Sequence, residues 1–138
     1  MLEPTSHDLV IARLLALLED DWVPACALAS FVYHSGVTTP PENRDVCLAL
    51  VQEALVSDWI RVGRLNPQFE AWEMPVADMM SRLAGEWPRD TLPGLGDSPC
   101  WFDLTDTGRR RAAEFSQRFA IELKQKAGSY ARVSIRKS

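Results

Sequence analysis

Apolar residues recur at the spacing of amphipathic helices in three stretches of the first half of the chain. Ser6 is a suitable N-cap for the first helix, whose apolar positions are Ile11, Leu14, Leu15 and Leu18. Pro24 suits the first position of the second helix, and Gly36 suits the left-handed turn that ends it. This pattern predicts helices over residues 7–19, 24–35 and 41–57.

The second half of the chain alternates between short strand patterns, turn signals and two further helices. Two runs of strand-forming side chains are separated by the turn signal Asn66-Pro67. Glycine and proline recur between residues 89 and 99, which predicts a loop, and Thr105 is a suitable N-cap for the last helix. The pattern predicts strands over 59–65, 69–72 and 100–104, and helices over 75–87 and 106–126.

Three helices, two strands and a closing helix follow one another in the order of the winged-helix superfamily, a helix-turn-helix variant with a β-hairpin wing. Residues 49–60, with the sequence ALVQEALVSDWI, resemble the end of the third helix of bacterial winged-helix proteins, where the chain turns into the wing. Residues 102–109, with the sequence FDLTDTGR, resemble the L-T-x-x-G-R step with which those proteins begin the closing helix. The step has a physical basis, because Thr105 caps the first amides and Gly108 lets the first turn pack closely.

The resemblance implies a mostly helical α+β fold, with residues 1–127 as a winged-helix-like domain. Residues 75–99 depart from the family pattern, because they form an insertion that places a helix of its own in the wing. Residues 106–126 form a long closing helix, and residues 128–138 form a basic C-terminal tail. The resemblance implies a fold and no particular activity.

The composition is that of one globular domain, with 138 residues of which 46% are hydrophobic and 25% are charged. No apolar run reaches the ~20 residues that a membrane-spanning helix needs, and the first residues lack the basic start of a secretory signal. Three cysteines at wide spacing, Cys26, Cys47 and Cys100, argue against a disulfide framework. We therefore expect a soluble, cytoplasmic protein with free thiols and no association with membranes.

The net charge of −4 hides an uneven distribution along the chain. Residues 109–138 carry nine Lys or Arg against two Glu, a net charge of +7, whereas residues 1–108 have a net charge of −11. This asymmetry favours either a basic end that meets a polyanion or an acidic body that meets a basic partner. A third interpretation is that the two parts neutralise one another across the folded surface.

Catalytic and metal-binding signatures are missing from the sequence. Cysteine and histidine occur singly, and not at the paired spacing of a zinc site, at His7, Cys26, His34, Cys47 and Cys100. The sequence also lacks a glycine-rich phosphate loop, a Gly-x-Ser-x-Gly elbow and a His-Glu-x-x-His helix. We therefore expect a binding protein that is not an enzyme and has no cofactor.

The third helix, which would enter the major groove in a DNA-binding winged helix, is poorly suited to phosphates. Its polar side carries Asp45, Gln52 and Glu53, and Arg44 is its only cation. DNA binding and transcription regulation are nevertheless an alternative, because arginines also occur on the predicted wing and the closing helix. The candidates for contacts to nucleic acid are Arg44, Arg61, Arg64, Arg109, Arg110 and Arg111.

The function that we favour is binding of a protein, in the manner of an inhibitor or immunity protein of a basic partner. The acidic body would steer such a partner electrostatically. Trp72 and Trp87 flank the helix of the insertion and would anchor the partner if they remain partly exposed. A homodimer is also expected, because the first helix is apolar on nearly all sides and winged-helix proteins often pair through terminal helices.

Overall fold

The computed structural model of the chain describes residues 6–120 and 135–136. Over these residues the fold is α+β and mostly helical, as the sequence predicts. The helices are α1 (Ser6–Leu18), α2 (Ala25–His34), α3 (Pro40–Val56), α4 (Val76–Glu86) and α5 (Asp106–Arg118). The strands are β1 (Asp21–Pro24), β2 (Ile60–Leu65), β3 (Phe69–Ala71), β4 (Trp101–Leu104) and β5 (Ile135–Arg136). The predicted ends agree to within one residue except at the last helix, which is predicted to run to residue 126 but ends at Arg118, with Phe119 as its C-cap. Residues 121–126 lie outside the described part.

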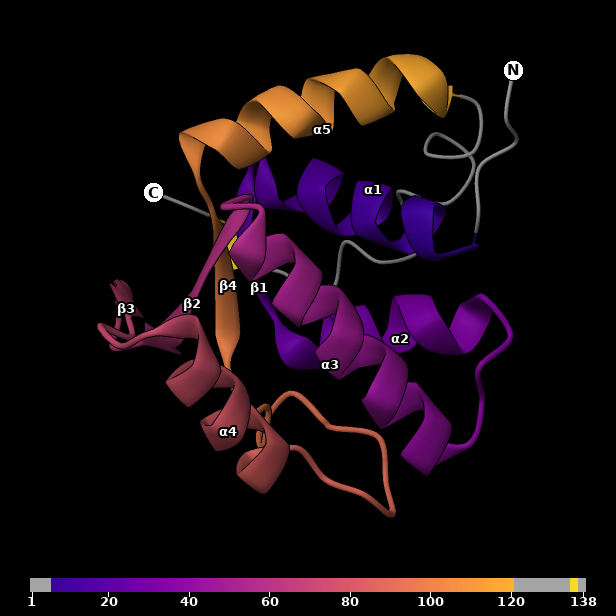
Figure 1. Cartoon of the computed structure of the whole chain (residues 1–138), viewed down its shortest axis with the longest axis vertical. Helices are drawn as coiled ribbons and strands as arrows, with labels where there is room; N and C mark the ends of the chain where they lie inside the picture. The colour runs from indigo at the N-terminus through magenta and orange to yellow at the C-terminus, as the bar shows by residue number, and fades with distance from the viewer. Residues whose placement is uncertain (1–5, 121–134, 137–138) are drawn as a thin grey trace.

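The strands form one antiparallel sheet in the order β3-β2-β4-β1-β5. In its centre β2 pairs with β4, with Ile60 opposite Leu104 and Val62 opposite Phe102. The N-cap Thr105 directly after a short aromatic strand predicts that residues 59–64 and 100–104 are neighbours in a sheet, and this register confirms it. The four side chains are buried, and Figure 1 shows α1, α2 and α3 on one side of the sheet. The core therefore lies between these helices and one face of the sheet.

β1 is a strand that the sequence pattern does not predict. The acidic residues 19–21 interrupt the helical pattern, and the pattern predicts only an extended conformation for Val23. In the structure Val23 lies opposite Phe102 of β4, and both side chains are buried, so a long-range pairing creates the strand. The basic tail contributes β5, which also pairs with β1. The other residues of that tail lie outside the described part.

α1 is covered on most of its surface within a single chain. It packs against α5 and α2, and it also contacts β1 and β4 (Figure 1). Val10, Leu14, Leu15 and Leu18 are fully buried. The apolar character that led us to expect a homodimer is therefore accounted for by contacts inside the chain.

The connection from α3 to β2 is joined to the start of α5 by several short contacts. Thr105 caps α5 as predicted, because its Oγ1 accepts a hydrogen bond from the amide of Gly108 at 2.9 Å. The amide of Thr105 donates to the Trp59 carbonyl at 3.1 Å, and its hydroxyl donates to the Asp58 carbonyl. A Cβ on Gly108 would lie 1.9 Å from the Trp59 carbonyl oxygen, so only glycine permits this approach.

A candidate protein-binding surface on α3 and α4

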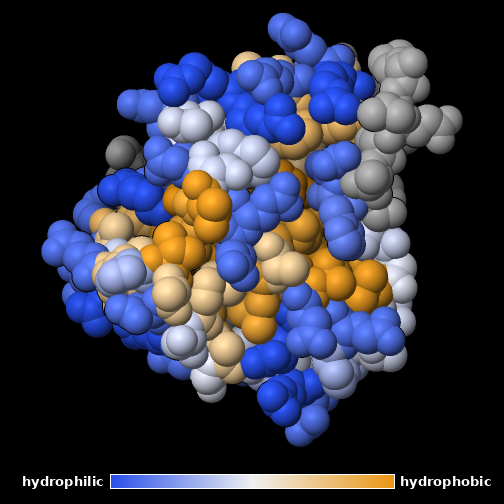
Figure 2. Space-filling model, viewed as in Figure 1, coloured by the Kyte–Doolittle hydropathy of each residue, from blue (hydrophilic) through white to orange (hydrophobic). Residues whose placement is uncertain are grey.

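α3 crosses the middle of one face of the molecule and exposes a polar side along its length (Figure 1). The exposed residues of this side, which we call the α3 surface, are Pro41, Glu42, Asp45, Ala49, Gln52, Glu53 and Val56. They include three carboxylates and no cation, and Val56 keeps 69% of its surface exposed. Figure 2 shows hydrophobic residues gathered across the middle of this face, with hydrophilic residues among and around them. The face thus combines negative charge with apolar contacts.

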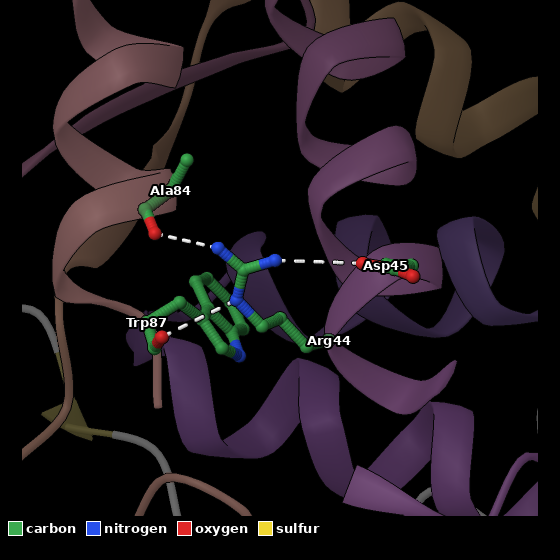
Figure 3. A network of polar contacts seen from close by, with 4 residues as sticks. All are labelled: Arg44, Asp45, Ala84 and Trp87. Atoms are coloured by element: carbon green, nitrogen blue, oxygen red, sulfur yellow. Dashed lines mark hydrogen bonds and ion pairs between the residues drawn. The ribbon is translucent and has the colours of Figure 1, made fainter. Parts of the chain in front are cut away.

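Arg44 belongs to α3, and its guanidinium reaches toward the end of α4 (Figure 3). Its side chain is 10% exposed, and its guanidinium donates to the carbonyls of Ala84 and Trp87. The last carbonyls of a helix lack partners inside the helix, and the helix dipole favours a cation beside them. Arg44 also contacts Asp45 at 3.4 Å. Arg44 therefore caps α4. A contact to nucleic acid would require Arg44 to be exposed, and it is buried.

α4 rests on α3 through its apolar side and turns its polar side to solvent. Leu83 is fully buried, and Met80 is partly buried against the core. Trp87, directly after α4, keeps only 2% of its surface exposed, so it does not meet the condition for a surface anchor. The packing of α4 on α3 brings this ring into the core, which its position in the sequence does not reveal.

Trp72 is partly buried, and one face of its ring is already occupied. The guanidinium of Arg82 on α4 lies over this ring at 3.9 Å from its centroid. Arg82 also pairs with Glu86 at 3.4 Å. Arg82 is not among the predicted site residues, although its separation of four residues from Glu86 is typical of an ion pair on a helix. The contact with Trp72 depends on tertiary structure and has no signal in the sequence.

The two arginines of the predicted wing are exposed, but each is paired with a carboxylate on a neighbouring strand. Arg61 of β2 forms an ion pair with Asp103 of β4, and Arg64 of β2 pairs with Glu70 of β3 at 2.9 Å. Both pairs consist of residues directly opposite each other in antiparallel strands. Each carboxylate thus offsets part of the positive charge that β2 would offer to phosphates.

The remaining three candidates lie in the first half of α5. Arg109 and Arg110 are exposed, whereas Arg111 pairs with Glu114 at 2.7 Å and lies over the Phe115 ring at 4.3 Å. α5 packs against α1. The six arginines that the sequence suggests for contacts to nucleic acid thus lie on three elements, α3, β2 and α5. The one on α3, Arg44, is buried.

The three cysteines are free thiols; Cys47 and Cys100 are buried, and Cys26 is partly buried. Burial raises the pKa of Cys47 and Cys100, and it also raises the pKa of Cys26, so the protonated forms are favoured. Within the described residues, no three His, Cys, Asp or Glu side chains gather as a metal ion would require. Across the same part of the chain, no helix is both long enough and apolar enough to cross a membrane.

Comparison with protein-family models, with curated proteins and with solved structures gave no match. Neither a family nor a relative therefore assigns a role to any residue.

Proposed function

We propose that this chain is a winged-helix module that binds a protein through the α3 surface and does not act as an enzyme. The order of three helices, the antiparallel strands β2 and β4, and the closing helix α5 supports the winged-helix assignment. In this assignment α4 and the loop after it form the insertion at 75–99 in an enlarged wing. α3 then corresponds to the helix that reads bases in DNA-binding members of the superfamily.

The charge of the α3 surface is the observation that carries the proposal. Glu42, Asp45 and Glu53 are exposed there, whereas Arg44 caps α4. DNA binding gains free energy when cations of the protein release counterions from the phosphates, so an acidic helix would be repelled. The same carboxylates would attract a basic protein and speed its association.

The position of α4 also disfavours the entry of α3 into DNA. An α-helix with its side chains is about 10–12 Å wide and the major groove is about 12 Å wide, so one helix fills the groove. α4 packs against the side of α3, and packed helices lie about 8–10 Å apart. With α3 in the groove, α4 would meet the phosphate backbone, and its exposed residues include Asp78 and Glu86.

A basic protein is the partner that fits this surface. The negative charge extends beyond α3, because residues 1–108 have a net charge of −11. Val56 is 69% exposed and would add an apolar contact beside the carboxylates. An inhibitor or immunity-like protein that masks a basic protein would use such a surface.

Charge reversal on the α3 surface is expected to abolish capture of the partner. In the double variant Glu42→Lys, Glu53→Lys, two attractive charges become repulsive, and capture by the tagged chain from nuclease-treated host extract should fall at least about tenfold. The matched control is Glu19→Lys, which reverses an exposed charge outside the α3 surface and should retain capture. Equal capture by the parent chain and both variants would contradict a role for this surface.

The alternative function is that of a DNA-binding transcriptional regulator. One observation favours it, namely the net charge of +7 over residues 109–138, of which Arg109 and Arg110 are exposed on α5. Such a segment would attract phosphates without sequence preference.

Because the α3 surface is acidic and the basic segment has no sequence preference, we expect no appreciable binding of duplex DNA at physiological salt. Any residual binding at that salt should be non-specific, with a Kd of ~10⁻⁴ to 10⁻⁶ M; it should become tighter at low salt and weaken steeply as salt rises. The measurement is a titration with random and genomic duplexes at two salt concentrations.

Two variants distinguish the contribution of the tail to DNA binding from that of α3 in this titration. Arg132→Gln with Lys137→Gln lowers the charge of the tail and should reduce the binding, whereas Gln52→Ala on the α3 surface should leave it unchanged. Nanomolar, sequence-selective binding that resists salt and is lost in Gln52→Ala would establish the DNA regulator instead.

A further inference from the structure

A pocket of about 380 Å³ lies between α4 and the sheet, apart from the α3 surface. Its lining comes from β2, from the residue after β3, from α4, and from the start of β4 and the segment that leads into it. The volume lies within the range of about 300–1,000 Å³ that is typical of small-molecule sites. The side chains that define its chemistry are Arg64, Arg82, Glu86, Asp97, Trp72 and Trp101.

The two arginines are ordered by contacts that use only part of each guanidinium. Arg64 donates through Nε to Glu70 at 2.9 Å, and Arg82 donates through Nε to Glu86 at 3.4 Å. Among the described residues, the terminal nitrogens of both side chains have no hydrogen-bond acceptor, and the planar fork of a guanidinium suits a carboxylate. Arg82 also lies over the Trp72 ring at 3.9 Å, which orders it before a ligand arrives and reduces the entropy lost on binding.

Glu86 and Asp97 provide negative charge in the same pocket. Asp97 accepts a hydrogen bond from the amide of Gly94 at 2.7 Å through Oδ1, which orders this carboxylate. A carboxylate has about four acceptor sites, so both side chains can accept further hydrogen bonds from an ammonium group. The pocket therefore offers donors for an anion and acceptors for a cation within one small volume.

We propose that this pocket binds a free α-amino acid in its zwitterionic form. A purely anionic ligand such as a nucleotide would be repelled by Glu86 and Asp97, and a simple cation would be repelled by Arg64 and Arg82. A zwitterion satisfies both pairs, with its carboxylate toward the arginines and its ammonium group toward the carboxylates. Trp72 and Trp101 supply apolar contact for the ligand's side chain.

The site is independent of the proposed partner, because it does not include the α3 surface. Its lining joins α4 to β2 and to the segment before β4. A bound amino acid would therefore also stabilise the position of α4 on the sheet.

The test is a titration of the full chain with each of the twenty common amino acids. Binding is measured by tryptophan fluorescence and by isothermal titration calorimetry. We expect at least one of them to bind saturably and to raise the unfolding temperature. Its N-acetyl derivative and its amide derivative each lack one of the two charges, and each should bind at least about tenfold more weakly.

Two substitutions in the pocket and one outside it test whether the amino acid binds to the pocket arginines. Arg82→Gln and Arg64→Met should each weaken the binding about tenfold, whereas Arg89→Gln, an exposed cation outside this pocket, should leave it unchanged. Circular dichroism checks that the variants fold, and either pocket variant suffices if the other does not fold.

Three results would overturn the proposal. One is the absence of binding by all twenty amino acids up to about 10 mM. Another is binding that persists unchanged in the folded pocket variants. The third is binding of the N-acetyl derivative as tightly as the free amino acid, which would indicate a site for anions.

Discussion

Replacement of Leu50 by aspartate is expected to unfold the protein. Leu50 lies in α3 with 2% of its surface exposed, inside the core between the helices and the sheet. An unpaired carboxylate at such a position costs several kcal/mol, comparable to the whole stability of about 5–15 kcal/mol that is typical of a domain. Circular dichroism should show the loss of the cooperative thermal transition.

The matched control is Gln52→Asp, which introduces the same side chain on the exposed side of the same helix. Substitutions at exposed positions usually change the free energy of unfolding by no more than about 0.5 kcal/mol. We therefore expect this variant to unfold cooperatively within a few degrees of the parent chain. Equal thermal stability of the two variants would show that α3 has a different orientation.

Gly108→Ala is expected to lower the free energy of unfolding by about 2–4 kcal/mol. The added Cβ would lie 1.9 Å from the Trp59 carbonyl oxygen and 2.8 Å from Cδ1 of Leu104. The Leu104 side chain can rotate, but the Trp59 oxygen belongs to the backbone and accepts the 3.1 Å hydrogen bond from Thr105. The start of α5 must therefore move away from the connection between α3 and β2. Urea unfolding followed by tryptophan fluorescence measures the loss.

The same substitution at Gly85 is the control, and its expected effect has the opposite sign. A Cβ at Gly85, in α4, would have no atom within 4 Å. Alanine is favoured over glycine in a helix by up to about 1 kcal/mol, so Gly85→Ala should be neutral or slightly stabilising. A Gly108→Ala variant as stable as the parent chain would exclude the close approach of α5 to Trp59.

Most helices and strands of this protein can be predicted from the sequence, because the signals that define them are local. A helix forms its hydrogen bonds between near neighbours, and its apolar side repeats at intervals of three and four residues. The pairing of β2 with β4 can also be predicted, because Thr105 marks the end of a short aromatic strand. β1 lacks such a signal, since it is a strand only through its pairing with β4 and β5.

Some features of the α3 surface and its surroundings likewise follow from local sequence, whereas others depend on contacts between distant residues. The sequence alone predicts that Asp45 and Gln52 lie opposite the buried Leu50, because helix geometry places them there. The burial of Arg44 depends on tertiary contacts, because the Ala84 carbonyl to which it donates lies in a helix 40 residues further along the chain. The burial of Trp87 has the same origin. A local pattern shows which side of a helix must be covered, but which element covers it depends on contacts between residues far apart in the sequence.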